Sequence, residues 1–97
     1  MDRALLIGII LPNVYVDDVK NHLDELKMLS QTANVETLGV ITQRVQKINP
    51  AFYIGKGKAQ QVIDQAKLLG ANVVIFDDEL SPAQIKNYHK LAKKIKV

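Results

Sequence analysis

The sequence predicts an α/β fold, a three-layer sandwich built around a four-stranded parallel sheet. Short apolar or β-prone runs alternate along the chain with stretches whose apolar residues recur at steps of three and four, in the order β-α-β-α-β-α-β. A single helix between successive strands implies parallel strands joined by right-handed crossovers. The 97 residues, 47% of them apolar, are enough for one core and one domain, residues 1–97.

The first strand is expected at Ala4–Leu11, because side chains on both of its faces are apolar, as in a central strand covered by helices. Pro12 and Asn13 end this strand. The first helix is expected at about residues 17–33, and its first turn carries aspartates, which the helix dipole favours there. Its apolar residues recur at helical spacing: Val19, Leu23, Leu26, Leu29 and Ala33.

The second strand is expected at Val35–Val45, where β-prone residues of mixed polarity indicate a position near an edge of the sheet. Asn49 and Pro50 break it. The second helix is expected at about residues 57–69, and Gly70 follows it where a left-handed C-terminal cap is needed. Its apolar residues also follow helical spacing: Ala59, Val62, Ile63, Ala66 and Leu69.

The third strand is expected at Val73–Phe76, a wholly apolar run that is typical of a buried strand. The third helix is expected to begin with a capping box. Ser81 caps the free N–H groups, Pro82 suits the first turn and Gln84 reaches back to the cap. The buried face of this helix is expected to comprise Ile85, Tyr88, Leu91, Ala92 and Ile95.

A fourth strand is expected to begin at residues 95–97. The most apolar strand should lie inside the sheet, so the expected strand order is 2-1-3-4. The first helix should cover one face, with the other two helices opposite.

Composition excludes several classes of protein. The absence of cysteine excludes thiol catalysis, Cys-ligated zinc and a disulfide scaffold, and it fits a reducing compartment. No apolar run approaches the roughly 18–20 residues of a membrane span. The N-terminus also lacks the pattern of a signal peptide. A cytoplasmic location is therefore expected.

Charge is distributed unevenly along the chain, whose net charge is +3. Residues 1–48 carry five Lys or Arg and six acids, whereas residues 49–97 carry eight Lys and four acids. A basic C-terminal half permits contact with phosphate groups.

Ligands bind to open parallel sheets at the carboxyl ends of the strands, which points to loops 12–16, 46–58 and 77–81. In the first of these loops, Asn13 and Tyr15 have side chains able to hydrogen-bond a ligand. Residues of this kind more often make the turn itself.

The second loop contains a glycine-rich turn at the start of a helix, Tyr53-Ile54-Gly55-Lys56-Gly57-Lys58. Free N–H groups and two lysines fit an anion-binding turn around Gly55 and Gly57. In the alternative interpretation, the glycines allow a tight turn with positive φ and the lysines are only solvated. The turn is not a P-loop, because its spacing differs and no Ser or Thr follows to hold magnesium.

The third loop carries Asp77-Asp78-Glu79, whose carboxylates suit Mg²⁺, but no acid ends the first strand to complete such a site. The alternative is that these acids favour the N-terminus of the following helix. His22 and His89 have no Ser or Cys partner at a recognisable spacing. We therefore expect no catalytic residue, no metal site and no enzymatic activity in these residues themselves.

Two motifs, taken together, carry a family likeness. The first is Phe52-Tyr53-Ile54-Gly55-Lys56-Gly57-Lys58, and the second runs from Val74-Ile75-Phe76-Asp77-Asp78-Glu79 through Leu80-Ser81-Pro82-Ala83-Gln84 to Asn87. With Gln43-Arg44 in the preceding strand, they resemble the N-terminal domain of HflX-type GTPases across essentially the whole chain.

The resemblance implies a GTPase associated with the large ribosomal subunit, in which this α/β domain precedes a helical linker and a separate GTP-binding domain. GTP and Mg²⁺ are expected in that later domain, because this chain has neither Gly-x-x-x-x-Gly-Lys-Ser/Thr nor Asn-Lys-x-Asp. The 97 residues are thus expected to be a fragment that binds no cofactor and has no GTPase activity of its own.

Three functions stay open. The first is binding to the large ribosomal subunit and its RNA through Arg44, Lys47, Lys56, Lys58, Lys90, Lys93 and Lys94. The second is binding and weak hydrolysis of a nucleotide such as ATP, with Lys56 and Lys58 on phosphate and Asp77 or Asp78 on Mg²⁺. The third is a docking surface that regulates the GTPase domain of the same protein.

Overall fold

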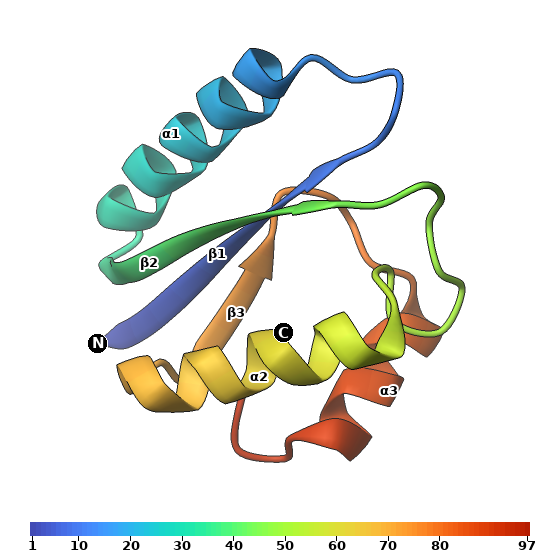
Figure 1. Ribbon diagram of the computed structural model, residues 1–97. Coiled ribbons are helices and arrows are strands. Elements are labelled where there is room, and N and C mark those ends of the chain that lie inside the picture. The colour runs from blue at the N-terminus through green and yellow to red at the C-terminus, as the bar shows by residue number, and fades with distance from the viewer.

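A computed structural model describes residues 1–97 and contains three strands and three helices. Their order is β1 (Asp2–Ile10), α1 (Val16–Thr32), β2 (Val35–Arg44), α2 (Lys56–Leu69), β3 (Val73–Phe76) and α3 (Pro82–Leu91). The strands form one parallel sheet in the order β2-β1-β3, with α1 on one face and α2 and α3 on the other (Figure 1). The expected three-layer arrangement of sheet and helices is confirmed.

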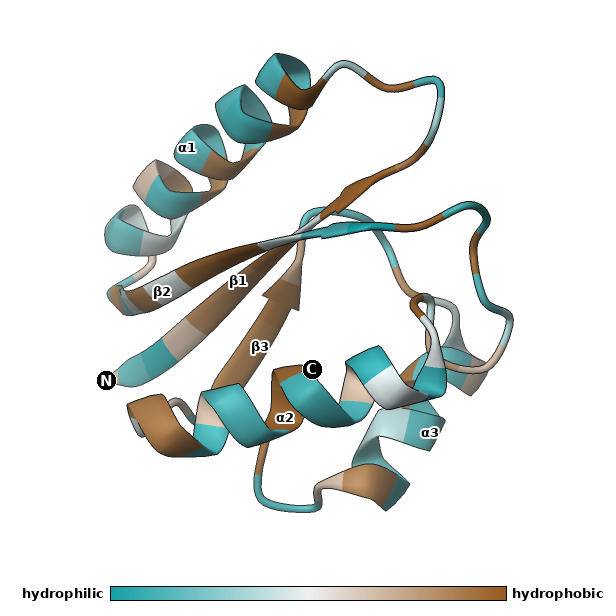
Figure 2. Cartoon of the chain, viewed as in Figure 1, coloured by the Kyte–Doolittle hydropathy of each residue, from teal (hydrophilic) through white to brown (hydrophobic).

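Strand β1 lies between β2 and β3, and most of its residues are hydrophobic (Figure 2). Its buried side chains belong to the cores on both sides of the sheet. Leu5 and Ile7 pack in the core below α2 and α3, whereas Leu6 packs against Val19 and Leu23 of α1. A Cβ at Gly8 would lie only 2.6 Å from Cδ1 of Leu23, so α1 sits directly on β1. The edge position expected for the second strand is confirmed for β2.

The predicted fourth strand is not present. Lys96 alone pairs with β3: its N–H donates to the carbonyl of Asn72 at 3.0 Å, and its carbonyl accepts from the N–H of Val74 at 2.8 Å. The chain turns at residues 93–94, which leaves only this residue extended beside the strand. The order 2-1-3-4 therefore holds only for its first three strands, and Ile75 is half-buried rather than buried.

The helix ends follow the predicted capping signals. Gly70 ends α2 in the left-handed conformation, with φ 78°. Ser81 and Gln84 form the capping box at the start of α3, where Oγ of Ser81 accepts from the N–H of Gln84 at 3.2 Å. Helix α3 ends at Leu91, so Ile95 is buried from the turn that follows and does not extend the helix as expected. None of the helices is long and apolar enough to cross a membrane.

Candidate nucleic-acid interface

The glycine loop comprises residues 46–55 between β2 and α2 and the first turn of α2, residues 56–58. Asn49 shapes it, because its N–H and carbonyl both bond to the backbone of Tyr53 at 2.9 Å. Oδ1 of Asn49 also accepts from the N–H groups of Ala51 and Phe52, at 2.8 and 3.0 Å. Tyr53 is held in the left-handed region, with φ 69°. The loop therefore has a defined shape although it contains no strand.

Three side chains of α3 hold the glycine loop from below. The donors are Nε2 of Gln84 to the carbonyl of Asn49 (2.9 Å), Nδ2 of Asn87 to the carbonyl of Ala51 (2.9 Å) and the hydroxyl of Tyr88 to the carbonyl of Phe52 (2.7 Å). Residues three and four apart lie on one face of a helix, which is why α3 presents all of them to the loop. The second sequence motif thus supplies the side chains that hold the first.

An aromatic cluster supports these hydrogen bonds. The Phe52 and Tyr88 rings meet edge to face with centroids 5.3 Å apart, and Phe76 lies 5.5 Å from Tyr88. Burial raises the pKa of Tyr88. Burial and the neighbouring Asp78 carboxylate raise the pKa of Tyr53 to about 12. A tyrosine hydroxyl is protonated at neutral pH even with an ordinary pKa, so that of Tyr88 is a donor to the loop.

Gly55 and Gly57 are not needed for backbone conformation. The interpretation that they allow a positive φ is wrong, because φ of Gly55 is −60° and the only glycine with a positive φ is Gly70. A Cβ built at Gly55 or Gly57 would meet no atom within 4 Å. These two positions leave the outer side of the loop bare, where another molecule can approach the backbone closely.

The start of α2 offers donors without partners from its own cap. Gly55 at the N-cap has no side chain to accept a bond from the first turn, and that turn contains no acid. Lys56 and Lys58 are exposed in the same turn. Backbone N–H groups and two ammonium groups with open space before them suit a phosphate.

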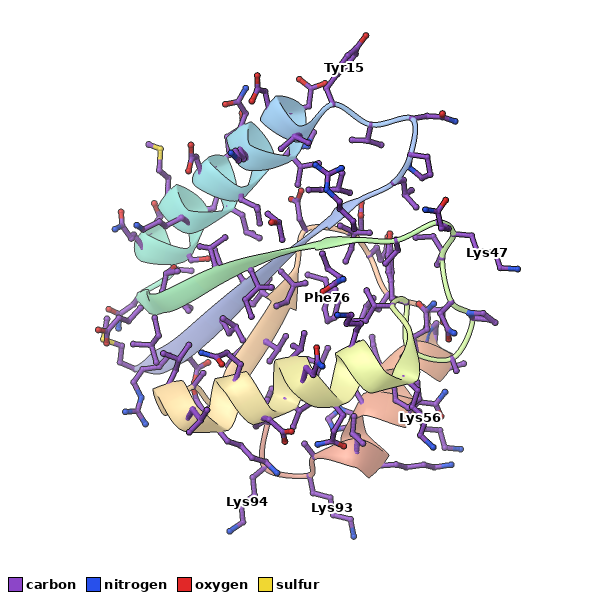
Figure 3. All side chains as sticks on the ribbon, in the orientation of Figure 1. Tyr15, Lys47, Lys56, Phe76, Lys93 and Lys94 are labelled. Atoms are coloured by element: carbon purple, nitrogen blue, oxygen red, sulfur yellow. The ribbon has the colours of Figure 1, made fainter.

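The basic residues expected at the site are all exposed, but the structure does not bring them all together. Arg44 ends β2, and Lys47, Lys56 and Lys58 belong to the glycine loop, so these four lie along the carboxyl-end edge of the sheet. The other three, Lys90, Lys93 and Lys94, lie at the end of α3 or in the turn after it. Figure 3 shows Lys93 and Lys94 pointing away from the sheet, far from Lys47.

Sequence reasoning missed two groups of residues. It gave no role to Asn87 and Tyr88 in holding the loop, because each bonds to a backbone carbonyl 36 residues earlier in the chain. It also omitted Lys67 and Lys86, which are exposed on α2 and α3. Both lysines lie between the apolar residues of an amphipathic helix, and this pattern in the sequence predicts that they are exposed.

Two of the three acids after β3 face protein side chains. Oδ2 of Asp77 lies 3.8 Å from Nδ1 of His22 on α1, and Asp78 lies beside Tyr53. Burial raises the pKa of Asp77, and the nearby His22 offsets only part of this rise. No group of three His, Asp or Glu side chains is arranged to hold a metal ion.

Comparison with known protein families decides where the chain belongs. The sequence profile of the family described as GTP-binding GTPase N-terminal matches residues 20–97, which include the glycine loop and α3. The chain belongs to this family. The resemblance to the N-terminal domain of HflX-type GTPases is thereby confirmed.

Curated relatives of this GTPase N-terminal domain share its sequence over most of its length. GTPase HflX of Lacrimispora saccharolytica is 41% identical over 86 residues, which cover 89% of this chain and 20% of that protein. GTPase HflX of Escherichia coli (strain K12) is 37% identical over 86 residues, and that of Flavobacterium psychrophilum is 32% identical over 90 residues. The chain spans about a fifth of the length of these relatives.

Proposed function

We propose that this GTPase N-terminal domain binds the large ribosomal subunit and positions an HflX-type GTPase there through contacts with ribosomal RNA. The observation that carries the proposal is the glycine loop, which combines uncapped N–H groups, Lys56 and Lys58, and a bare surface at both glycines. Phosphate groups are the ligands that such a turn suits, and RNA presents them along its whole backbone.

The family supplies the setting of this proposal. The relatives are named GTPases, and the chain spans about a fifth of their length. GTP and Mg²⁺ would bind in a GTP-binding domain outside these residues, and that domain would be the second partner of this one. Both partners would be met in the cytoplasm. The domain itself then acts by binding, not by catalysis.

The nucleotide-hydrolase alternative is not favoured. It requires Asp77 or Asp78 to hold Mg²⁺ while Lys56 and Lys58 hold phosphate. Asp77 instead faces His22, and Asp78 lies beside the hydroxyl of Tyr53. Both carboxylates thus have protein neighbours, and no group of three His, Asp or Glu side chains is arranged there to hold a metal ion.

Co-sedimentation of the chain with purified large ribosomal subunits tests the proposal. Lys56→Glu/Lys58→Glu places like charge opposite phosphate, so we expect it to weaken binding about tenfold or more. The control is Lys20→Glu/Lys27→Glu, which makes the same change of charge on exposed positions of α1 and should leave binding nearly unchanged. Equal weakening by both pairs would mean that the glycine loop has no special part in binding.

A further inference from the structure

The two outer layers of the sandwich differ in charge. Helix α1 carries four acids and two lysines. Helices α2 and α3 together carry a single acid, Asp64, whose Oδ1 accepts a bond from Gln60 at 2.9 Å. Helices α2 and α3 and the turn after α3 present seven exposed lysines. Lys58 lies in the glycine loop, and the other six are here called the basic face: Lys56, Lys67, Lys86, Lys90, Lys93 and Lys94.

Helical geometry directs this face away from the sheet. Gln84 and Tyr88 are the buried residues of α3. Lys86 and Lys90 each lie two positions later, about 200° around the helix, and therefore on its solvent side. Figure 3 shows Lys56, Lys93 and Lys94 on the side of the molecule that α2 and α3 form, whereas Tyr15 projects beyond α1.

The basic face is poor in the large rings and guanidinium groups that stack on bases. Four of the five aromatic rings are buried or half-buried, and the remaining one, Tyr15, is 80% exposed at the start of α1. The two arginines, Arg3 and Arg44, belong to β1 and β2. Stacking of unpaired bases requires aromatic rings or guanidinium planes, and bidentate readout of guanine favours Arg. Besides the imidazole of His89 and the exposed glutamines of α2, the positively charged groups of this face are all ammonium groups, which act on phosphates as point charges.

We infer that the basic face binds the sugar–phosphate backbone of a double-stranded RNA helix without reading its sequence. This inference rests on the proposed function and specifies the form of RNA that the domain meets. A duplex presents two rows of phosphates in a fixed arrangement, which lysines on rigid helices can meet at once. A single strand must be ordered first, and the face has only one ring, the imidazole of His89, on which its bases could stack to offset that cost.

The test measures the affinity of the 97-residue chain by fluorescence anisotropy. The probes are an RNA duplex of about 16 base pairs, a second duplex of scrambled sequence and the separated first strand. At equal phosphate concentration we expect both duplexes to bind equally, and about fivefold or more tighter than the strand. Tighter binding of the strand, or a marked preference for one duplex, would overturn the inference but leave RNA binding standing. Binding to none of the probes would overturn the inference, and co-sedimentation with large subunits then shows separately whether the proposed function also fails.

Two matched variants locate the contact. Lys86→Glu/Lys90→Glu changes only solvent-side positions of α3, and it should weaken duplex binding about tenfold. Lys20→Glu/Lys27→Glu makes the same change on α1 and should not. Thermal melting followed by circular dichroism verifies that each variant folds. Duplex binding unchanged by the α3 pair would overturn the assignment to this face.

Discussion

Gln84 joins local folding to the candidate site. Its N–H and its Oε1 complete the capping box with Ser81, and its Nε2 donates to the carbonyl of Asn49 in the glycine loop. The side chain is buried, with 6% of its surface exposed. One residue therefore fixes both where α3 begins and where the loop lies above it.

Substitutions at the two members of the capping box separate these roles. Ser81→Ala removes the cap alone, so it should lower the free energy of unfolding by about 0.5–2 kcal/mol, while Ser81→Asp is tolerated. Gln84→Ala also leaves the carbonyl of Asn49 without its donor, which should cost about 1 kcal/mol more. Urea denaturation measures both losses. If Gln84→Ala costs no more than Ser81→Ala, the bond to the loop adds nothing to stability.

Asp77 gives stability a dependence on pH. Burial raises its pKa above the ordinary 3.8, so the folded chain holds this proton more tightly than the unfolded chain. The stability contributed by this group is complete below the ordinary value and is lost as pH rises through the raised pKa. Asn does not titrate, so the Asp77→Asn variant lacks this pH-dependent loss of stability. Its free energy of unfolding should therefore decline less than that of the wild type between about pH 3 and pH 7. Parallel curves for the two proteins would exclude Asp77 as the source.

At the scale of the elements, two glycines have opposite reasons to be present. Gly8 lies where α1 packs on β1, and its added Cβ would lie 2.6 Å from Leu23 and 2.9 Å from Val19. Gly57 lies in the first turn of α2, with nothing within 4 Å of an added Cβ. The first glycine serves the fold, and the second leaves room outside it.

Alanine at these two positions should therefore act in opposite directions. Gly8→Ala should destabilise the chain by about 1–3 kcal/mol, because α1 must shift or change rotamers. Gly57→Ala should be neutral or stabilise by up to about 1 kcal/mol, because alanine favours the helix. The proposed RNA contact adds that Gly57→Ala weakens binding to large subunits despite its stability. Thermal unfolding and co-sedimentation measure the two effects, and unimpaired binding by Gly57→Ala would show that the bare surface is not used.

The elements themselves were largely predictable, because their signals are local. Apolar periodicity placed the strands and helices within a few residues, and the caps at Gly70 and Ser81 depend only on neighbouring residues. The prediction of a fourth strand was wrong, because a strand forms only where several residues pair with a neighbouring strand, and only Lys96 pairs with β3. Pairing over distance is not written in the local pattern.

The site was predictable only in part, for the same reason. The glycine turn and its lysines were visible in the sequence as a motif. The hydrogen bonds from Asn87 and Tyr88 to the loop were not visible there, since they join side chains to backbone carbonyls 36 residues away. The role of the glycines depends on the three-dimensional fold, because only the surroundings of an added Cβ distinguish a strained turn from an open surface.

At the scale of the whole molecule, the uneven charge of the sequence becomes a difference between faces. The acids of α1 lie on one side of the sheet, and the lysines of α2 and α3 lie on the other. A molecule arranged in this way meets a polyanion in one orientation, because turning it over would bring like charges together. We therefore expect α1 to face away from the RNA.

The chain alone should not bind GTP. It contains neither a phosphate-binding loop of the P-loop pattern nor a guanine-recognition motif. Isothermal titration with GTP and Mg²⁺ should show no saturable binding at micromolar concentrations. Tight binding that survives Lys56→Ala/Lys58→Ala would reveal a nucleotide site elsewhere in the domain.

The salt dependence of binding to large ribosomal subunits tests the central claim most directly, which is that the domain holds RNA through its phosphate groups. We expect the logarithm of the binding constant to fall linearly with the logarithm of the salt concentration. Lys56→Glu/Lys58→Glu should reduce the magnitude of that slope by about 0.7–0.9 for each phosphate that the variant no longer neutralises. Equal and salt-independent binding by the wild type and this variant would contradict the claim and would indicate a surface that docks on protein instead.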